Sequence, residues 1–312
     1  MPEMIGRFAP TPSGYLHPGN LLCAMLAYLS VRAQGGRFSL RIEDLDKARC
    51  PRHLVTQAIQ DLEFLGITWD FPILYQSERQ EIYQAAFDLL RTRAEIYPCF
   101  CSRADLHASL APNRGDTVFL YPGTCRHLGE AEIAERRKGK RPAYRIHVPD
   151  TTVAFHDRIV GPFSASLADT SGDFILMRAD GVFAYNLAVV VDDALTGVTE
   201  VVRGNDILTS TPCQIYLQDL LGYERPEYAH IPLLVDEHGE RLAKRNQVIS
   251  LAGLLKLHTR EEIIGALAYA CGLLPENRPA TLEALIPLFR WSAIANSDFH
   301  LPAGFLPAAS SM

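Results

Sequence analysis

The beginning of the chain alternates short apolar strands, polar turns and amphipathic helices, and this order constrains the fold most strongly. Residues 4–8 predict a buried strand, residues 9–15 a Pro/Gly-rich turn, and residues 21–32 a helix that ends at Gly35-Gly36. A second strand over 38–42 and a second helix up to Gly66 follow. Strands joined by crossover helices build parallel sheets, so the sequence predicts an α/β fold.

The middle of the chain departs from this pattern. Between residues 98 and 129 the periodicity weakens and Cys, Pro, Gly and Asn gather, which predicts an inserted subdomain. Residues 144–180 alternate β-branched and polar residues, as short strands do. The apolar run 187–191, which ends in Asp192-Asp193, predicts a buried central strand. The residues after Lys244 predict helices.

Composition excludes several classes of protein. The chain has 312 residues, of which 48% are hydrophobic and 21% charged, enough to bury a sizeable core. Neither a secretory signal nor an apolar run of about 18 residues is found, so we expect a cytoplasmic protein without membrane spans. Seven cysteines without a disulfide-like spacing favour reduced thiols or a metal site. The net charge of -6 argues against a globally basic nucleic-acid binder.

Two segments have the chemistry of a nucleotide site. The turn that ends in His17-Pro18-Gly19-Asn20 opens a helix, where backbone N–H groups and the helix dipole favour an anion. His17 can donate to a phosphate, or it can only cap the helix beside Pro18. The basic loop 241–245 can neutralise a triphosphate, or it can be an ordinary solvated loop.

Six ordered motifs resemble those of one enzyme family. They are Arg7-Phe8-Ala9-Pro10-Thr11-Pro12-Ser13-Gly14-Tyr15-Leu16-His17-Pro18-Gly19-Asn20, Arg41-Ile42-Glu43-Asp44-Leu45-Asp46, Tyr185-Asn186 with Asp192-Asp193, Arg203-Gly204-Asn205-Asp206, His230-Ile231-Pro232-Leu233-Leu234 and Arg241-Leu242-Ala243-Lys244-Arg245. Their order and spacing over residues 4–250 are similar to those of the glutamyl and glutaminyl branch of class I aminoacyl-tRNA synthetases. The first motif resembles the His-Ile-Gly-His signature of that class, and the last resembles its Lys-Met-Ser-Lys-Ser loop.

The resemblance implies a fold and a reaction. The fold is a Rossmann-like, parallel-sheet class I catalytic domain with an inserted zinc-containing subdomain, a short helical C-terminal region and no anticodon-binding domain. Its segments are 1–97 for the first half of the catalytic domain, 98–142 for the zinc-binding insert, 143–250 for an acceptor-type insert with the second half and the basic loop, and 251–312 for the helical C-terminal segment. The reaction is an ATP-dependent ligation that activates glutamate, with Mg²⁺ on the phosphates. It needs positioning and charge stabilisation but no protein nucleophile.

The resemblance assigns catalysis to His17 and Lys244, and ATP binding to His17, Gly19, Asn20 and Lys244. Three positions differ from the family motifs. Asn20 replaces the second His of the first signature and can donate a hydrogen bond without carrying charge. Arg241 and Ala243 replace a Lys and a Ser of the family loop. These differences are expected to affect the rate of the reaction more than its type.

Glutamate carries two carboxylates and one ammonium, so its pocket needs two cationic or donor-rich poles and one acidic pole. The resemblance assigns this pocket to Arg7, Thr11, Glu43, Tyr185 and Arg203. In this interpretation Glu43 holds the ammonium and both arginines hold carboxylates, with Arg203 at the side-chain end. The alternative is a structural ion pair of Glu43 with Arg41 or Arg7, and a surface position for Arg203.

The cysteines of the insert predict a metal site. Three thiolates and a fourth donor suit tetrahedral zinc better than harder ions. The resemblance assigns one structural zinc to Cys99, Cys101, Tyr121 and Cys125, with His127 as a reserve ligand. The alternative is that these cysteines and the tyrosine are packing residues. Cys23, Cys50, Cys213 and Cys271 lack partners at ligand spacing and are expected to pack in the core.

The acceptor is inferred from the resemblance to a short paralogue in this family. Glutamyl-tRNA synthetases continue well beyond the basic loop to an anticodon-binding region, whereas this sequence ends soon after it. The paralogue activates glutamate without tRNA and places it on the queuosine base in the anticodon of tRNA(Asp). The alternatives are a minimal glutamyl-tRNA synthetase that charges a 3′ end, and an inactive paralogue that binds RNA or glutamate. We expect a monomer.

A run of cations at residues 136–141 adds a candidate RNA contact. Lys and Arg supply most of the sequence-independent affinity for RNA phosphates. The alternative is a solvated helix end followed by a turn.

Overall fold

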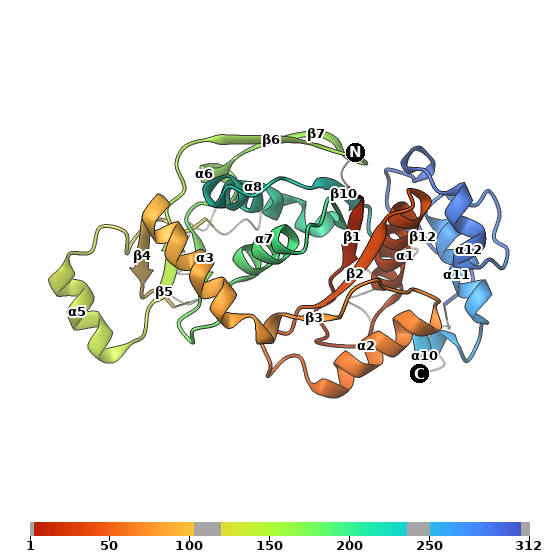
Figure 1. Cartoon of the computed structure of the whole chain (residues 1–312), viewed down its shortest axis with the longest axis horizontal. Helices are drawn as coiled ribbons and strands as arrows, with labels where there is room; N and C mark the ends of the chain where they lie inside the picture. The colour runs from red at the N-terminus through yellow and green to blue at the C-terminus, as the bar shows by residue number, and fades with distance from the viewer. Residues whose placement is uncertain (1–2, 103–119, 236–249, 307–312) are drawn as a thin grey trace.

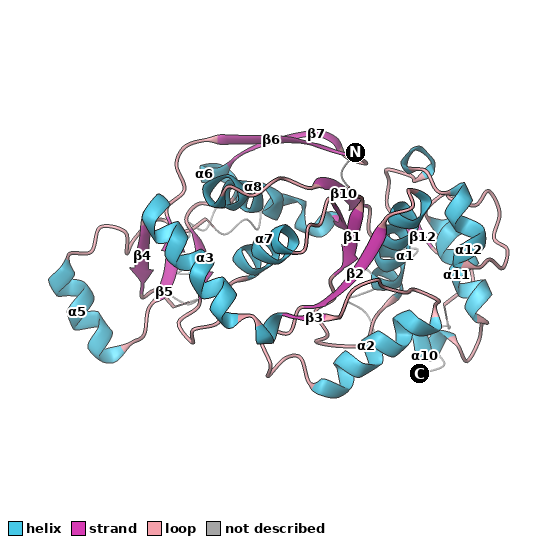
Figure 2. Ribbon diagram, viewed as in Figure 1, coloured by secondary structure: helices cyan, strands magenta, loops and turns pink. Residues whose placement is uncertain are grey.

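A seven-stranded, mostly parallel sheet forms the centre of the protein. The computed structural model describes residues 3–102, 120–235 and 250–306. The strand order is β3-β2-β1-β9-β10-β6-β7; neighbouring strands from β3 to β6 are parallel, and β7 is antiparallel to β6. Figure 2 shows the strands in magenta, with helices in cyan around them. The strands are β1 Ile5–Phe8, β2 Arg37–Ile42, β3 Leu74–Tyr75, β6 Thr152–Asp157, β7 Gly161–Ser166, β9 Glu200–Gly204 and β10 Glu227–Ile231.

Two smaller sheets extend this core. The strands β4 Ile96–Cys99, β5 Ala143–Ile146 and β8 Phe174–Met177 form an antiparallel sheet in the order β4-β5-β8. The strands β11 Leu234–Val235 and β12 Phe299–His300 pair in parallel and tie the C-terminal region to the segment after β10. The molecule is elongated, with the β4-β5 region at one end and the C-terminal helices at the other (Figure 1).

Helices cover both faces of the central sheet. The α-helices are α1 Pro18–Ala33, α2 Arg52–Phe64, α3 Gln80–Arg93, α5 Glu130–Gly139, α6 Leu167–Thr170, α7 Tyr185–Leu195, α8 Thr211–Leu221, α10 Leu251–Leu254, α11 Arg260–Ala270 and α12 Leu282–Leu285. The short 3-10 helices are η1 Gln76–Glu78, η2 Asn205–Ser210, η3 Ile286–Leu288 and η4 Trp291–Ala293. Within the described residues, no helix combines the length and apolar character that a membrane span requires.

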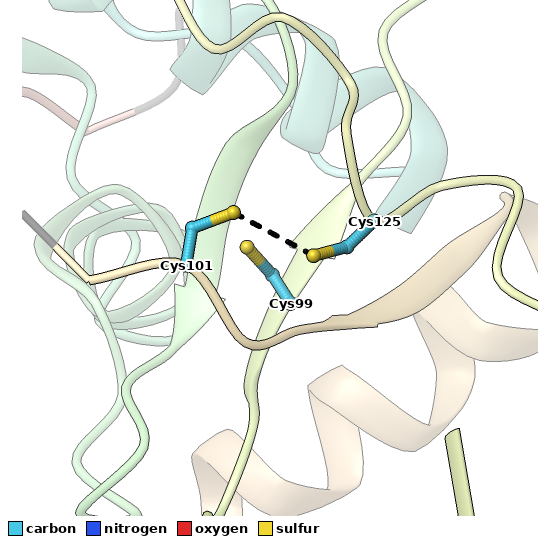
Figure 3. Close-up of side chains that lie close together, drawn as sticks. All are labelled: Cys99, Cys101 and Cys125. Carbon is cyan, nitrogen blue, oxygen red and sulfur yellow. Dashed lines mark hydrogen bonds between the residues drawn. The ribbon is translucent and has the colours of Figure 1, made fainter. Parts of the chain in front are cut away.

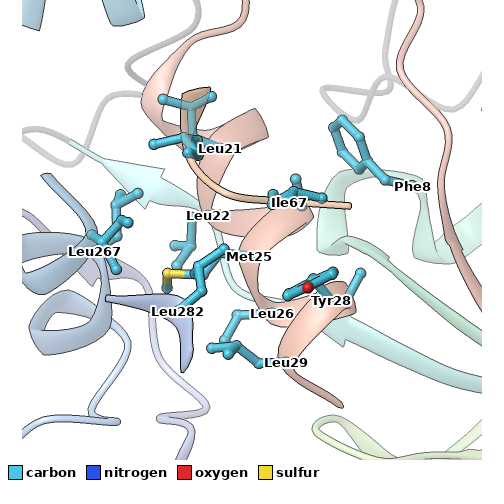
Figure 4. Close-up of a cluster of buried hydrophobic side chains, with 14 of the residues drawn as sticks. Phe8, Leu21, Leu22, Met25, Leu26, Tyr28, Leu29, Ile67, Leu267 and Leu282 are labelled. Atoms are coloured by element: carbon cyan, nitrogen blue, oxygen red, sulfur yellow. The ribbon is translucent and has the colours of Figure 1, made fainter. Parts of the chain in front are cut away.

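Two hydrophobic cores hold these layers together. One core joins α1 and the sheet to the C-terminal helices, so that Met25 of α1 lies near Leu267 of α11 and Leu282 of α12 (Figure 4). The other core joins α3, α7 and α8 to the sheet and to β5 and β8. The C-terminal segment is therefore packed against α1 and the central sheet as part of the same core.

The first strands and helices confirm the expectations from sequence, whereas the run 187–191 does not. This run was predicted to be a buried strand, but it lies inside α7. Every residue from Leu187 to Asp193 is buried, because α7 packs against α3 and α8 as well as the sheet core. A helix that is buried all round has no polar face, so its sequence resembles that of a buried strand.

Gly6 allows β1 and α1 to approach closely. A Cβ on Gly6 would overlap Cγ2 of Val31 on α1. Val31 is β-branched and fully buried, so its side chain has little freedom to move aside. This contact fixes the position of α1, and with it the helix N-terminus, at the carboxyl edge of the sheet.

We expect Gly6→Ala to lower the free energy of unfolding by about 1–3 kcal/mol, the usual cost of overpacking a core. Chemical denaturation would measure this change. Gly14→Ala is the control, because a Cβ at Gly14 meets no atom within 4 Å. Val31→Ala combined with Gly6→Ala should be more stable than the sum of the single changes predicts. A fully stable Gly6→Ala protein would contradict the packing argument.

Candidate active site and metal centre

A cavity of about 470 Å³ opens at the carboxyl ends of β1, β9 and β10, beside the N-terminus of α1. The strand order changes direction between β1 and β9, the position at which open α/β sheets bind their ligands. Eight residues predicted from sequence line this one cavity: Arg7, Thr11, His17, Gly19, Asn20, Glu43, Tyr185 and Arg203. Lys244 lies outside the described residues.

His17 is the N-cap of α1. Its Nδ1 atom accepts hydrogen bonds from the backbone N–H groups of Gly19 (3.1 Å) and Asn20 (3.4 Å), and the Asn20 side chain accepts from the His17 backbone (3.2 Å). Burial lowers the pKa of His17, although Asp206 opposes this effect. The ring is therefore neutral, with its proton on Nε2. Capping and donation to a phosphate are compatible, because they use different ring nitrogens.

A buried cluster of four charges lies beneath the cavity. Asp193 of α7 accepts from Arg7 Nε (3.3 Å) and from Arg41 Nη1 (2.5 Å). Arg41 Nη2 also donates to Glu43 Oε1 (3.2 Å), and Thr11 donates to Glu43 Oε2 (3.4 Å). The ion pair between Glu43 and Arg41, considered above as an alternative to ligand binding, thus exists. Glu43 nevertheless lines the cavity, and burial raises its pKa against the opposing effect of Arg41 and Arg7.

Arg203 does not lie on the surface. Its side chain is buried, and each of its nitrogens has a partner: Nε donates to His230 Nε2 (2.9 Å), Nη1 to Gln214 Oε1 (2.7 Å) and Nη2 to Thr211 Oγ1 (2.7 Å). The Tyr185 hydroxyl lies 3.4 Å from Nη1. A guanidinium held in this way presents a fixed orientation to the cavity.

Three cysteines converge at the end of the β4 strand. The sulfur atoms of Cys99, Cys101 and Cys125 all lie within 4.8 Å of one another, and Cys101 and Cys125 are 3.6 Å apart (Figure 3). The Tyr121 hydroxyl lies 3.5 Å from Cys99 Sγ and 3.8 Å from Cys101 Sγ. The four predicted ligands thus come together, and this cysteine cluster can hold a metal ion. His127 is exposed and is not part of the group.

Arg145 was not identified from the sequence, and it contacts two of these side chains. Its Nε atom donates to Cys99 Sγ (3.3 Å), and its guanidinium carbon lies 3.9 Å from the centre of the Tyr121 ring. Arg145 is buried. A buried guanidinium needs negative charge close to it, which a metal-bound thiolate supplies. Three sulfur donors and one phenolic oxygen fit a tetrahedral zinc ion better than Mg²⁺ or Ca²⁺.

We expect Asp193→Asn to lower the free energy of unfolding by about 3–5 kcal/mol, because it leaves two buried guanidiniums without their shared carboxylate. Denaturant titration at neutral pH would measure the loss. Exposed Asp219, which pairs with exposed Arg225, offers a control. Asp219→Asn should change stability by less than about 1 kcal/mol.

The same pair of variants gives a test with pH. Burial alone would raise the pKa of Asp193, but Arg41 and Arg7 outweigh it and hold the pKa below its ordinary value. The stabilisation is therefore complete above the unfolded-state pKa of about 4 and is lost as pH falls through the folded-state value. Asp193→Asn should lack this part of the acid sensitivity. An acid-unfolding profile identical to that of the unaltered protein would contradict the assignment.

Comparisons with known proteins agree with this geometry. A family model described as tRNA synthetases class I (E and Q), catalytic domain, matches residues 3–259. A glutamyl-Q tRNA(Asp) synthetase of Symbiobacterium thermophilum is 46% identical over 98% of each chain. One of Geobacter sulfurreducens is 44% identical over 99% of this chain and 97% of its own.

Solved structures point to the same family. A glutamate-tRNA synthetase from Elizabethkingia anophelis has a TM-score of 0.84 to this structure at 25% identity. The match covers 97% of this chain and 69% of the other. The chain therefore belongs to the glutamyl-Q tRNA(Asp) synthetase family of class I tRNA synthetases and is an ATP-dependent ligase.

Proposed function

We propose that this ligase activates glutamate with ATP in the absence of tRNA and transfers it to the queuosine base in the anticodon of tRNA(Asp). The observation that carries the proposal is the single cavity in which a helix N-terminus suited to phosphate meets two arginines suited to carboxylates. The names of relatives that match nearly the whole chain support the choice of acceptor.

In the first step the α-carboxylate of glutamate attacks the α-phosphorus of ATP, and the bond to pyrophosphate breaks. Arg7 and Arg203 hold the carboxylates of the substrate, and Glu43 holds its ammonium. Both oxygens of Glu43 already accept one hydrogen bond each, but a carboxylate has about four acceptor positions, so an ammonium can still bind. Mg²⁺, when bound, neutralises phosphate charge, and we assign the same role to Lys244.

In the second step a hydroxyl of the queuosine cyclopentenediol attacks the carbonyl carbon of the adenylate. The new ester bond forms as the bond to AMP breaks, and the hydroxyl loses its proton. The vicinal hydroxyls of this ring resemble those of ribose, so the same acyl-transfer geometry can serve both acceptors.

The helix α5 is a candidate contact for RNA phosphates. None of its residues is buried, and it projects from one end of the molecule (Figure 1). The cations Arg136, Arg137, Lys138, Lys140 and Arg141 are all exposed at its C-terminal end. Arg137, Lys138 and Lys140 have partners within the chain: the Tyr144 hydroxyl, Glu135 and the Phe100 carbonyl, respectively. Arg136 and Arg141 are therefore the better candidates to bind phosphate.

We expect radiolabelled glutamate to be transferred to tRNA(Asp) that contains queuosine and not to tRNA(Asp) that lacks it. The assay uses the protein with ATP and Mg²⁺, followed by location of the label within the RNA.

Lys244→Ala should reduce glutamate-dependent ATP–pyrophosphate exchange strongly and should leave the thermal unfolding unchanged.

Each other outcome identifies an alternative. Label on the 3′ end of tRNA(Glu) would make the protein a minimal glutamyl-tRNA synthetase. Absence of both transfer and exchange would favour a binding paralogue without activity. Unchanged exchange in Lys244→Ala would remove that residue from the mechanism while leaving the acceptor assignment intact.

We further propose that Cys99, Cys101, Tyr121 and Cys125 bind one structural zinc ion within an insert that spans residues 98–142. The convergence of three sulfurs and a phenol supports this ligand set, and so does the Arg145 cation beside it. Three thiolates around one Zn²⁺ leave a net negative charge, which a neighbouring guanidinium offsets.

We expect Cys99→Ser to lower the zinc content from about one ion per chain and to lower the thermal unfolding temperature, because a structural zinc contributes directly to folding. Metal analysis by mass spectrometry and thermal unfolding would measure both effects. Cys271→Ser is the control, because Cys271 is a buried free cysteine outside the group. An unchanged zinc content in Cys99→Ser would show that the ligand set is wrong.

A further inference from the structure

Arg203 is hydrogen-bonded to His230, which is in turn bonded to Asp157, and neither His230 nor Asp157 lines the cavity. His230 of β10 accepts from Arg203 Nε at its Nε2 atom (2.9 Å), and its Nδ1 atom lies 2.6 Å from Asp157 Oδ2 at the end of β6. Asp157 and His230 are both fully buried, with 0% of each side chain exposed. Neither is among the residues that line the cavity, whereas Arg203 and Tyr185 are.

Hydrogen-bond donors and acceptors determine where the proton of His230 lies. Arg203 Nε–H can only donate, so His230 Nε2 must accept, and the ring proton must be on Nδ1. Nδ1–H then donates to Asp157. A protonated ring would instead place N–H against N–H and two cations side by side. Burial and Arg203 lower the pKa of His230 against the opposing effect of Asp157, which agrees with a neutral ring.

Asp157 is itself fixed by the backbone. Its Oδ1 atom accepts from the N–H groups of Ile159 (2.9 Å) and Val160 (3.0 Å), and its Oδ2 atom accepts from the N–H group of His230 (3.0 Å). A carboxylate with this many donors stays ionised and immobile. Asp157 therefore fixes the ring of His230, and His230 in turn fixes the orientation of Arg203.

We propose that Asp157 and His230 are positioning residues that set the selectivity of the enzyme for glutamate, by fixing the orientation in which Arg203 binds the side-chain carboxylate. This inference rests on the proposed role of Arg203 in glutamate binding. Gln214 and Thr211 hold the two terminal nitrogens of Arg203, so His230 fixes the third corner of the planar group. Loss of the hydrogen bond at Nε lets the guanidinium plane rotate out of the orientation in which it binds a carboxylate bidentately.

Asp157→Asn tests this arrangement with almost no change in volume. The amide oxygen of Asn, placed where Oδ1 lies, can accept from the N–H groups of Ile159 and Val160 and from the His230 N–H, which lies 3.2 Å from that position. This placement turns the NH₂ group toward His230 Nδ1. Nδ1 must then accept, the ring proton moves to Nε2, and His230 no longer accepts from Arg203. His230→Gln and His230→Leu form a second pair, because the Gln side-chain oxygen can still accept from Arg203 and Leu cannot.

Glutamate-dependent ATP–pyrophosphate exchange by the whole protein is the measurement. Asp157→Asn and His230→Leu should raise the KM for glutamate about tenfold or more, as expected for a misplaced binding group, with the KM for ATP within about twofold of its original value. Selectivity for glutamate over glutamine should fall. His230→Gln should show a smaller rise, and it keeps the test available if the other variants do not fold.

The control is a second buried carboxylate, which contacts a histidine at a place outside the cavity. Asp173 Oδ1 lies 3.1 Å from His147 Nδ1 and accepts from the Val148 backbone N–H (2.8 Å). Asp173→Asn should lower thermal stability and leave the KM for glutamate unchanged.

Two results separate the possible failures. An unchanged KM for glutamate in Asp157→Asn and His230→Leu, or an equal rise in both KM values, would overturn the positioning role and leave the proposed function standing. A lack of glutamate-dependent exchange in the unaltered protein would overturn the proposed function itself.

Discussion

The structure depends on one buried carboxylate, Asp193, which binds guanidiniums from two neighbouring strands. Arg7 comes from β1 and Arg41 from β2, while Asp193 comes from α7 on the face of the sheet. Without that negative charge, two arginines could not remain buried within reach of the same atom. The adjacent Asp192 accepts from Gln76, Arg79 and Tyr83, and so fixes α7 against η1 and α3. Two consecutive acids thus join the floor of the cavity to its supporting helices.

Sequence reasoning succeeded where structure and chemistry are local. The strand β1, its turn and α1 follow from consecutive residues, and the capping box of His17 and Asn20 lies within four positions. The cysteines Cys99, Cys101 and Cys125 also lie close along the chain and meet in space. In each case short-range spacing determines the geometry, so that residue order alone carries enough information.

Prediction from sequence failed where burial on all sides, or pairing between residues far apart in the chain, determines the structure. The apolar run inside α7 was assigned to a strand, because burial on all sides removes the polar face that marks a helix. The pair Asp192-Asp193 was noticed, but its partners lie more than 100 residues away along the chain. Arg145 and Asp157 belonged to no motif, and only the folded sheets place them beside Cys99 and His230. The structural role of a buried charged residue can be assigned only once its partner is known.

The balance of charge in the cavity bears on the proposed binding of ATP and glutamate. Two arginines and two carboxylates line it, Arg7 and Arg203 against Glu43 and Asp206, and His17 is neutral. These groups nearly cancel, whereas ATP and glutamate together bring several negative charges. Backbone N–H groups at a helix N-terminus supply only about half a positive charge. In the proposed reaction we assign the remaining positive charge to Mg²⁺ and to the basic segment 241–245, whose sequence is rich in Arg and Lys.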